Sequence, residues 1–384
     1  MSREMRAACE QAHFQDIDAL QAAVFSDSRC VFSEAFGAAD TSAIFDVASV
    51  TKMASTTLTA CVLHARGLLN LESTVGHFIP SLKTSHAGIQ VRHLLAHSSG
   101  LPAWKPFFQE ALTIPGAFPG PPSPSGISAA RERCLASVFG TPPVHPPGAQ
   151  RIYSDTGFIL LGEILSIAGS APLDELASRL VFEPAGLQST RFHRLGDPIE
   201  TKFVIPTGST RPRSPAPGQE GLFSELEQAS RLDPGEVDDD NAYALGGVAG
   251  HAGLFSTASD LGKLGALIIE EYFGADHLGA GDSLRLFAQV DAGPTGPPRS
   301  LGFDQIAAEG SSVGERWGKG TLGGFGHLGF TGCALWIDLD RKLSGALLTN
   351  RVLHGREHTA SIRSLRPQFY DGVITAYQSG HWLD

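Results

Sequence analysis

A serine and a lysine three residues apart are the residues of this chain best suited to chemistry. Ser49 and Lys52 lie in the segment Phe45-Asp-Val-Ala-Ser-Val-Thr-Lys-Met. We expect a helix from about Met53 to Arg66, and residues three apart share one face of a helix. The lysine amine would then lie over the serine hydroxyl. The first N–H groups of the helix would face the oxygen that becomes negative in acyl transfer. The spacing therefore predicts a serine that is acylated by its substrate.

This short motif has a second interpretation. A lysine that accepts a proton near neutral pH needs a pKa about three units below its usual value of about 10.4, and therefore a pocket with burial or nearby positive charge. Ser49 as a helix N-cap and Lys52 as an exposed side chain explain the same four residues. Further segments must decide between the two interpretations.

A tyrosine and an acid form the second segment, Arg151-Ile-Tyr-Ser-Asp-Thr-Gly, ahead of an apolar run from Phe158 to Ala168 that predicts a helix. Tyr153 and Asp155 are two residues apart in a loop and can both point into one cleft. A buried tyrosine near a lysine can exist partly as phenolate and relay protons. The alternative is a core tyrosine, with Ser154 or Asp155 as the N-cap.

The third segment, residues 323–332, is rich in glycine and contains His327, Leu328, Gly329 and Phe330. It is too glycine-rich for an ordinary strand. Glycine at such a place often marks a close approach between backbone and ligand. A free N–H at a strand edge beside the serine would supply a second donor to an oxyanion. The alternative is a glycine-rich turn with a surface histidine.

In chain order the segments are Ser-x-x-Lys, Tyr-x-Asp and His-x-Gly, and the chain here resembles the serine hydrolases of the class C β-lactamase and penicillin-binding-protein-like superfamily. Residues 91–102, 241–256 and 348–351 match that family too, and the resemblance runs from about residue 20 to 377. It implies an acyl-enzyme on Ser49, with Lys52 and Tyr153 moving the proton. It also implies an oxyanion hole made of the Ser49 and Phe330 amides, and a pocket bordered by Asp155, His327, Leu328 and Gly329.

Two departures from the family pattern bear on the substrate. Many members have Asn where this chain has Asp155, whose charge would favour a protonated Lys52. β-Lactamases and transpeptidases have Lys-Thr-Gly where this chain has His327-Leu328-Gly329, which weakens recognition of a substrate carboxylate. We therefore expect an esterase-like enzyme that cleaves an ester or amide. The alternatives are a D-amino-acid peptidase or carboxypeptidase, a β-lactamase, and a catalytically silent binding or sensor protein.

The elements that position these residues predict an α+β fold. Runs at 22–25 and 30–36, joined by a turn at Asp27 and Ser28, read as a hairpin, and runs at 333–337 and 343–349 read as another. A last helix is expected from about Thr359 to Tyr377. Both chain ends would thus form an antiparallel sheet flanked by helices. We expect one catalytic unit over 1–384, with an α/β part at about 1–80 and 245–384 and a mostly helical, loop-rich part at about 81–244. Residues 115–126 and 141–148 predict loops around a short helix at about 128–139, and residues 206–240 predict a further loop. We expect these loops to wall the active site, with disordered excursions as the alternative.

Composition excludes several classes of function. Charged residues make up 18% of the 384 residues and hydrophobic ones 42%, which is typical of a globular enzyme. The formal net charge of −11, without a basic patch, argues against nucleic acid as a partner. No run reaches the length of a membrane span or signal sequence, so we expect a cytoplasmic enzyme acting on a small ester, amide or short peptide. The five cysteines lack metal or disulfide spacing and are expected to be buried and reduced.

Other clusters resemble metal sites only superficially. His93 and His97 are four apart, as are His354 and His358, but both pairs lack the glutamate of a zinc protease motif. Structural roles are expected for them, and packing support for His251. The aspartates at 238–240 lack the spacing of a calcium loop, so a solvated acidic loop is expected. The sequence predicts no cofactor.

Overall fold

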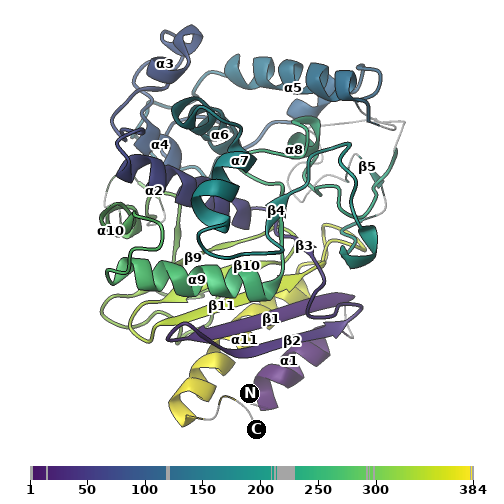
Figure 1. Ribbon diagram of the computed structural model, residues 1–384, viewed down its shortest axis with the longest axis vertical. Helices are drawn as coiled ribbons and strands as arrows, with labels where there is room; N and C mark the ends of the chain where they lie inside the picture. The colour runs from purple at the N-terminus through teal and green to yellow at the C-terminus, as the bar shows by residue number, and fades with distance from the viewer. Residues whose placement is uncertain are drawn as a thin grey trace.

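The computed structural model describes residues 3–13, 16–117, 122–208, 210–211, 213, 230–290, 293, 295–296, 299–380 and 382. An antiparallel sheet flanked by helices forms one part of the molecule, and a group of helices forms the other (Figure 1). The fold is therefore α+β, as the sequence predicts.

The main sheet joins the two ends of the chain, with the strand order β2-β1-β11-β10-β9-β8. Both predicted hairpins are present. At the first, Asp27 and Ser28 have positive φ values of 43° and 64°, which suits a tight turn between twisted strands. The strands are β1 (Ala19–Ser26), β2 (Arg29–Gly37), β8 (Asp304–Gln305), β9 (Gly324–Leu328), β10 (Ala334–Asp338) and β11 (Leu343–Thr349).

Helices cover both faces of this sheet (Figure 1). Helix α9 (Ala258–Tyr272) packs on one face, while α1 (Arg3–His13) and α11 (Ala360–Ser379) pack together on the other. The central strands β1 and β11 are buried along their whole length for this reason. Their largely apolar sequences reflect burial on two faces rather than one.

The second part of the molecule is mainly helical and surrounds α6, which is buried over most of its length because its sequence is apolar almost all round. Its helices are α2 (Leu58–Ala65), α3 (Val75–Phe78), α4 (Val91–Leu95), α5 (Pro124–Phe139), α6 (Asp155–Gly169), α7 (Leu173–Ala177), α8 (Asp240–Ala244) and α10 (Gly281–Ala288). Shorter turns of 3-10 or π helix are η1 (Lys52–Thr57), η2 (Pro80–Leu82), η3 (Phe107–Ala111), η4 (Ser178–Phe182) and η5 (Thr201–Phe203).

A small sheet positions the segment that precedes Ser49. Strand β3 (Phe45–Asp46) pairs with β7 (Leu254–Ser256), which also pairs with β4 (Arg191–Phe192). This pairing places the residues after β3 beside those just before β7. A separate pair is formed by β5 (Thr210–Arg211) and β6 (Ser230–Arg231).

The structure corrects two details of the sequence prediction. Helix α5 starts at Pro124 rather than near residue 128, because the Ser123 hydroxyl caps it by accepting from the Gly126 amide. Residues 324–328 form an ordinary strand despite their glycines. A Cβ at Gly326 would lie 2.3 Å from the Leu335 carbonyl oxygen, so close packing on β10 requires glycine there. Of the predicted loops, residues 118–121, 209, 212 and 214–229 lie outside the described residues.

All five cysteines are free, and four are buried. The prediction is wrong for Cys30, which is exposed because β2 is an edge strand of the main sheet. Taken singly, none of the described helices has both the length and the apolar character that a membrane crossing requires.

Candidate active site

Ser49 lies in a tight turn between β3 and a helix. The preceding residue, Ala48, has a φ of 48°, in the left-handed region that non-glycine residues rarely adopt. Its amide donates to the Asp46 carboxylate at 2.8 Å, which holds this strained turn. The helix then continues through η1, a turn of π helix, into α2. The predicted helix is thus confirmed, with a widened first part of a kind found often at functional sites.

Lys52 is fully buried, and its amine lies close to three oxygen atoms. The Nζ atom lies 3.0 Å from the Ser49 Oγ, 3.0 Å from the His251 carbonyl oxygen and 2.7 Å from the Asp155 Oδ1. Burial opposes the charge of the amine, but Asp155 and Tyr153 outweigh it and raise the pKa of Lys52. The lysine is therefore an ammonium group in this arrangement, which excludes the interpretation of Lys52 as an exposed side chain.

Tyr153 lies against the same amine, with the Lys52 Nζ 4.8 Å from the centre of its ring. Burial raises the pKa of Tyr153, and the opposing effect of Lys52 is smaller, so the ring carries a phenol. His97 holds this tyrosine in place. Its carbonyl accepts from the Ile152 amide at 2.8 Å and its Nδ1 from the Ser154 amide at 2.9 Å. Its ring centre lies 4.6 Å from that of Tyr153.

Asp155 is the first residue of α6. The Ser154 hydroxyl caps this helix by accepting from the Gly157 amide at 3.0 Å, which sets the direction in which the Asp155 side chain leaves the backbone. The sequence allowed either Ser154 or Asp155 as the cap. In the structure Ser154 is the cap, so Asp155 can reach Lys52.

The loop after β9 approaches the serine from the sheet side. A Cβ at Gly329 would lie 2.5 Å from the Val47 carbonyl oxygen, so only glycine permits this approach. The Thr331 hydroxyl donates to the Asp46 carbonyl at 2.9 Å and fixes the same contact. Within the ranges that the structure describes, the Ser49 and Phe330 amides have no recorded acceptor. Such amides are suited to an oxyanion.

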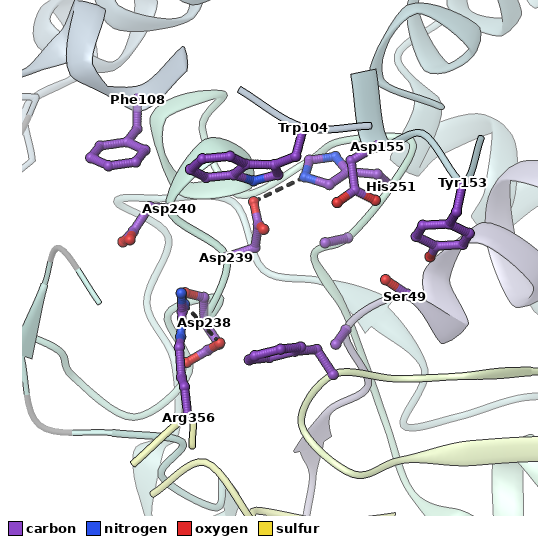
Figure 2. A pocket seen from close by; sticks show the side chains of 13 residues that line it. Ser49, Trp104, Phe108, Tyr153, Asp155, Asp238, Asp239, Asp240, His251 and Arg356 are labelled. Atoms are coloured by element: carbon purple, nitrogen blue, oxygen red, sulfur yellow. Dashed lines mark hydrogen bonds and ion pairs between the residues drawn. The ribbon is translucent and has the colours of Figure 1, made fainter. Parts of the chain in front are cut away.

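A cavity of about 150 Å³ opens beside Ser49 (Figure 2). In Figure 2, Trp104 and Phe108 lie along one side of it, and Ser49 and Tyr153 lie at one end. The lining consists of Ala48, Ser49, Trp104, Phe108, Tyr153, Asp155, Asp238, Asp239, Asp240, His251, Ala252, Phe330 and Arg356. Four of the predicted site residues, Ser49, Tyr153, Asp155 and Phe330, therefore line one cavity. Lys52 is not among the lining residues but contacts Ser49.

His327, Leu328 and Gly329 are not among the residues recorded as lining this cavity. His327 is buried on β9, with its ring centre 6.0 Å from that of Tyr153. Its Nδ1 donates to the Leu328 carbonyl at 2.7 Å, and burial lowers its pKa. The imidazole is therefore neutral, which differs from the permanent cation of a Lys-Thr-Gly segment.

The aspartates at 238–240 do not form a solvated loop, so that prediction is wrong. Asp238 accepts from Arg213 at 2.6 Å and from Arg356 at 3.1 Å, and Asp240 accepts from Arg211 at 2.7 Å. Both aspartates are about 95% buried. Burial on this scale is tolerated because each charge has a guanidinium partner.

His251 contacts the remaining aspartate of this run. Its Nε2 lies 2.9 Å from the Asp239 Oδ1, and the same oxygen accepts from the Ala242 amide. Burial would raise the pKa of Asp239, but His251 and the amide outweigh it and lower the pKa. The His251 carbonyl accepts from Lys52, and its ring contacts Asp239. His251 thus supports the cavity wall, as the sequence predicts.

Asp46 was missed in the sequence and links three segments of the site. One carboxylate oxygen accepts from the Ala48 amide and the other from the Asp238 amide at 2.6 Å, while its carbonyl accepts from Thr331. No spacing signals this role, because the partners lie far apart in the chain. Trp104, Arg356 and the tyrosine-positioning function of His97 were missed as well.

His93 and His354, one from each histidine pair, serve local structure, whereas His97 positions Tyr153. The His93 Nδ1 accepts from the Gln90 amide at 3.1 Å, and His354 pairs with Asp18 at 2.9 Å. Over the described ranges, no group of three or more His, Cys, Asp or Glu side chains is arranged to hold a metal ion.

Comparison with known proteins identifies the family of this chain. The family model described as "Beta-lactamase" matches residues 6–366. The chain belongs to the beta-lactamase family. Like other members of this family, it is a serine hydrolase, with the fold that the sequence resemblance implies.

Among similar proteins are two curated bacterial ones. An N-acetylmuramyl-L-alanine amidase of Bacillus subtilis is 28% identical over 333 residues, which are 81% of this chain and 68% of that protein. A putative D-alanyl-D-alanine carboxypeptidase of Escherichia coli is 26% identical over 361 residues, with 85% and 77% covered. Among solved structures, EstCE1, a hydrolase with promiscuous acyltransferase activity, has a TM-score of 0.68 at 20% identity, with 96% of this chain and 98% of that chain covered. The last similarity supports the fold alone.

Proposed function

We propose that this beta-lactamase-family enzyme cleaves a small carboxylic ester or amide through an acyl-enzyme on Ser49. The observation that carries the proposal is the 3.0 Å contact between the Ser49 Oγ and the Nζ of the buried Lys52. A lysine amine enclosed beside a hydroxyl at the start of a helix is suited to activate a nucleophile.

The remaining groups supply the other parts of the reaction. The Ser49 and Phe330 amides would hold the oxyanion of the tetrahedral intermediate. Tyr153, as a phenol next to Lys52, would donate a proton to the leaving oxygen or nitrogen, and Lys52 would replace that proton. Water in the place of the leaving group would then release the acyl group from Ser49.

The lining of the cavity favours a small acyl group without a carboxylate. Its volume of about 150 Å³ is below the roughly 300 Å³ at which pockets for drug-sized ligands begin. Arg356, the one cation among the residues that line it, is paired with Asp238. The neutral His327 adds no charge. Recognition of a β-lactam or peptide carboxylate is therefore expected to be weak.

A second candidate is a D-amino-acid peptidase or carboxypeptidase. It is supported by the names of two curated relatives, an N-acetylmuramyl-L-alanine amidase and a putative D-alanyl-D-alanine carboxypeptidase. This candidate differs from the first in substrate and not in mechanism, because the same acylated serine would serve both.

The test compares hydrolysis of p-nitrophenyl acetate, nitrocefin and a D-alanyl-D-alanine peptide by the wild type and by Ser49→Ala. We expect ester turnover that disappears in the variant, with little nitrocefin cleavage. Release of D-alanine without ester turnover would favour the peptidase. If the wild type cleaves none of the three and a fluorophosphonate probe does not label Ser49, the protein is a silent binder and the proposal is wrong.

A further inference from the structure

Three oxygen atoms surround the Lys52 amine. The Ser49 hydroxyl and the His251 carbonyl each accept a hydrogen bond from it at 3.0 Å, and the Asp155 Oδ1 forms an ion pair with it at 2.7 Å, while an ammonium group has three N–H bonds in all. The side chain is 0% exposed, so it has no direct contact with bulk water. In this arrangement Lys52 has no lone pair with which to receive the proton of Ser49.

Of the groups around the amine that the structure describes, only Asp155 can relieve this block. A carbonyl oxygen is not a base near neutral pH, and Ser49 is the group to be deprotonated. Tyr153, which also acts on the amine, carries a phenol because burial raises its pKa. The Asp155 Oδ1 is buried and has no hydrogen-bond partner in the described part of the chain, and of the three oxygen atoms it lies nearest to the Lys52 amine, with which it forms an ion pair. Its position is fixed, because its own amide donates to the Ala103 carbonyl at 2.8 Å and Ser154 caps the helix.

We propose that Asp155 is the proton acceptor that makes Lys52 a base. This inference rests on the proposed function of Ser49 as the nucleophile. One proton moves from the Lys52 Nζ to the Asp155 Oδ1, which converts the ion pair to a neutral amine and a carboxylic acid. A rotation of the amine by a third of a turn directs its lone pair at Ser49. The Ser49 Oγ then forms its bond to the substrate carbonyl carbon while its proton passes to Nζ, and the carbonyl electron pair moves to the oxyanion.

Burial makes this exchange accessible. The Lys52 side chain is 0% exposed and that of Asp155 20%, and loss of solvation by the ammonium group reduces the free-energy advantage of the ion pair over the neutral pair. The proton never leaves the pair of side chains.

The consequence is a distinctive dependence on pH. Because the proton passes between Lys52 and Asp155 and not to solvent, the reactivity of Ser49 should change little with pH. Burial lowers the pKa of both His97 and His327, and these imidazoles stay neutral. The other titratable or charged groups that face this pair from neighbouring elements are Tyr153, Asp239, His251, Arg299 and Asp304.

The test measures the second-order rate of labelling by a fluorophosphonate probe from pH 6 to 9.5, which requires no knowledge of the substrate. Wild type, Asp155→Asn and Asp155→Glu are compared, with Asp276→Asn, a change at an exposed position, as the matched control. We expect wild type and control to vary by less than about threefold over this range. Asp155→Asn should lose reactivity about tenfold per pH unit below the pKa of its unpaired Lys52, and Asp155→Glu should restore part of the flat profile.

Two results would overturn the inference. One is a wild-type rate that climbs tenfold per pH unit from 7 to 9, because Lys52 would then lose its proton to solvent. The other is a flat profile in Asp155→Asn. A wild type that labels with either of these profiles leaves Ser49 as the nucleophile, whereas a wild type that does not label at any pH contradicts both this inference and the proposed function.

Discussion

His97 is expected to control the reactivity of this enzyme although it does not line the cavity beside Ser49. Its carbonyl and its Nδ1 accept from the amides on either side of Tyr153, at 2.8 Å and 2.9 Å, and its ring packs on the tyrosine ring. Its backbone φ is 55°, a value that asparagine adopts more readily than other side chains with a Cβ. Substitution by asparagine or by leucine can therefore distinguish the effect of the Nδ1 acceptor from the effect of the ring contact.

The expected size of the effect follows from these contacts. In His97→Leu the buried Ser154 amide loses its acceptor, which costs about 1–3 kcal/mol, and loss of the ring contact adds about 0.5–1.5 kcal/mol. In His97→Asn the Oδ1 atom replaces Nδ1, so only the ring contact is lost. A displacement of Tyr153 by about 1 Å would lower turnover roughly a hundredfold. We expect this roughly hundredfold loss in the leucine variant and a loss of less than about tenfold in the asparagine variant.

The assay pairs urea unfolding with kcat and KM for p-nitrophenyl acetate. A purely structural role would lower the free energy of unfolding without changing the kinetics of the folded fraction. The expected result is a kcat that falls much more than KM changes, with recovery in His97→Asn. Equal activity of the leucine variant and the wild type would refute the argument, and so would an asparagine variant as inactive as the leucine one.

Three other changes test the site. Lys52→Ala should lower turnover at least about a hundredfold, against exposed Lys342→Ala as control, and near-normal kcat would remove the lysine from the mechanism. Gly329→Ala should lower kcat about 10- to 1,000-fold, because its Cβ would lie 2.5 Å from a carbonyl oxygen and displace the Phe330 amide; unchanged kcat would contradict that oxyanion donor. Burial raises the pKa of Asp46 to about 7, so the folded chain binds this proton more tightly than the unfolded one. The unfolding free energy of the wild type relative to Asp46→Asn should thus fall by about 2 kcal/mol from pH 5 to 7, and a rise in urea melts would contradict this.

The parts of the fold that depend on local sequence could be predicted. The two hairpins follow from apolar runs with turn residues between them, and the helix after Ser49 follows from its spacing. The contact between Ser49 and Lys52 needs only the geometry of one helix turn. Tyr153 and Asp155 could be placed beside them only through the order of motifs that the family resemblance supplies.

The parts that depend on distant partners could not be predicted. Asp238 and Asp240 read as a solvated acidic run because their arginine partners lie 25 or more residues away. Asp46 gives no signal because it binds two backbone amides and, through its carbonyl, a threonine 285 residues later. His97 had a visible signal, its place just after a short helix, but the segment of chain that its ring contacts could not be identified.

The most direct test of the central claim is to find the acyl group itself. The enzyme is mixed with p-nitrophenyl acetate, quenched in acid within milliseconds to seconds, digested and analysed by peptide mass spectrometry. We expect one acetyl group on the peptide that contains Ser49, which forms and decays at rates that agree with turnover and is absent in Ser49→Ala. Ester turnover without acylation of that peptide, or with the acyl group on another residue, would contradict it.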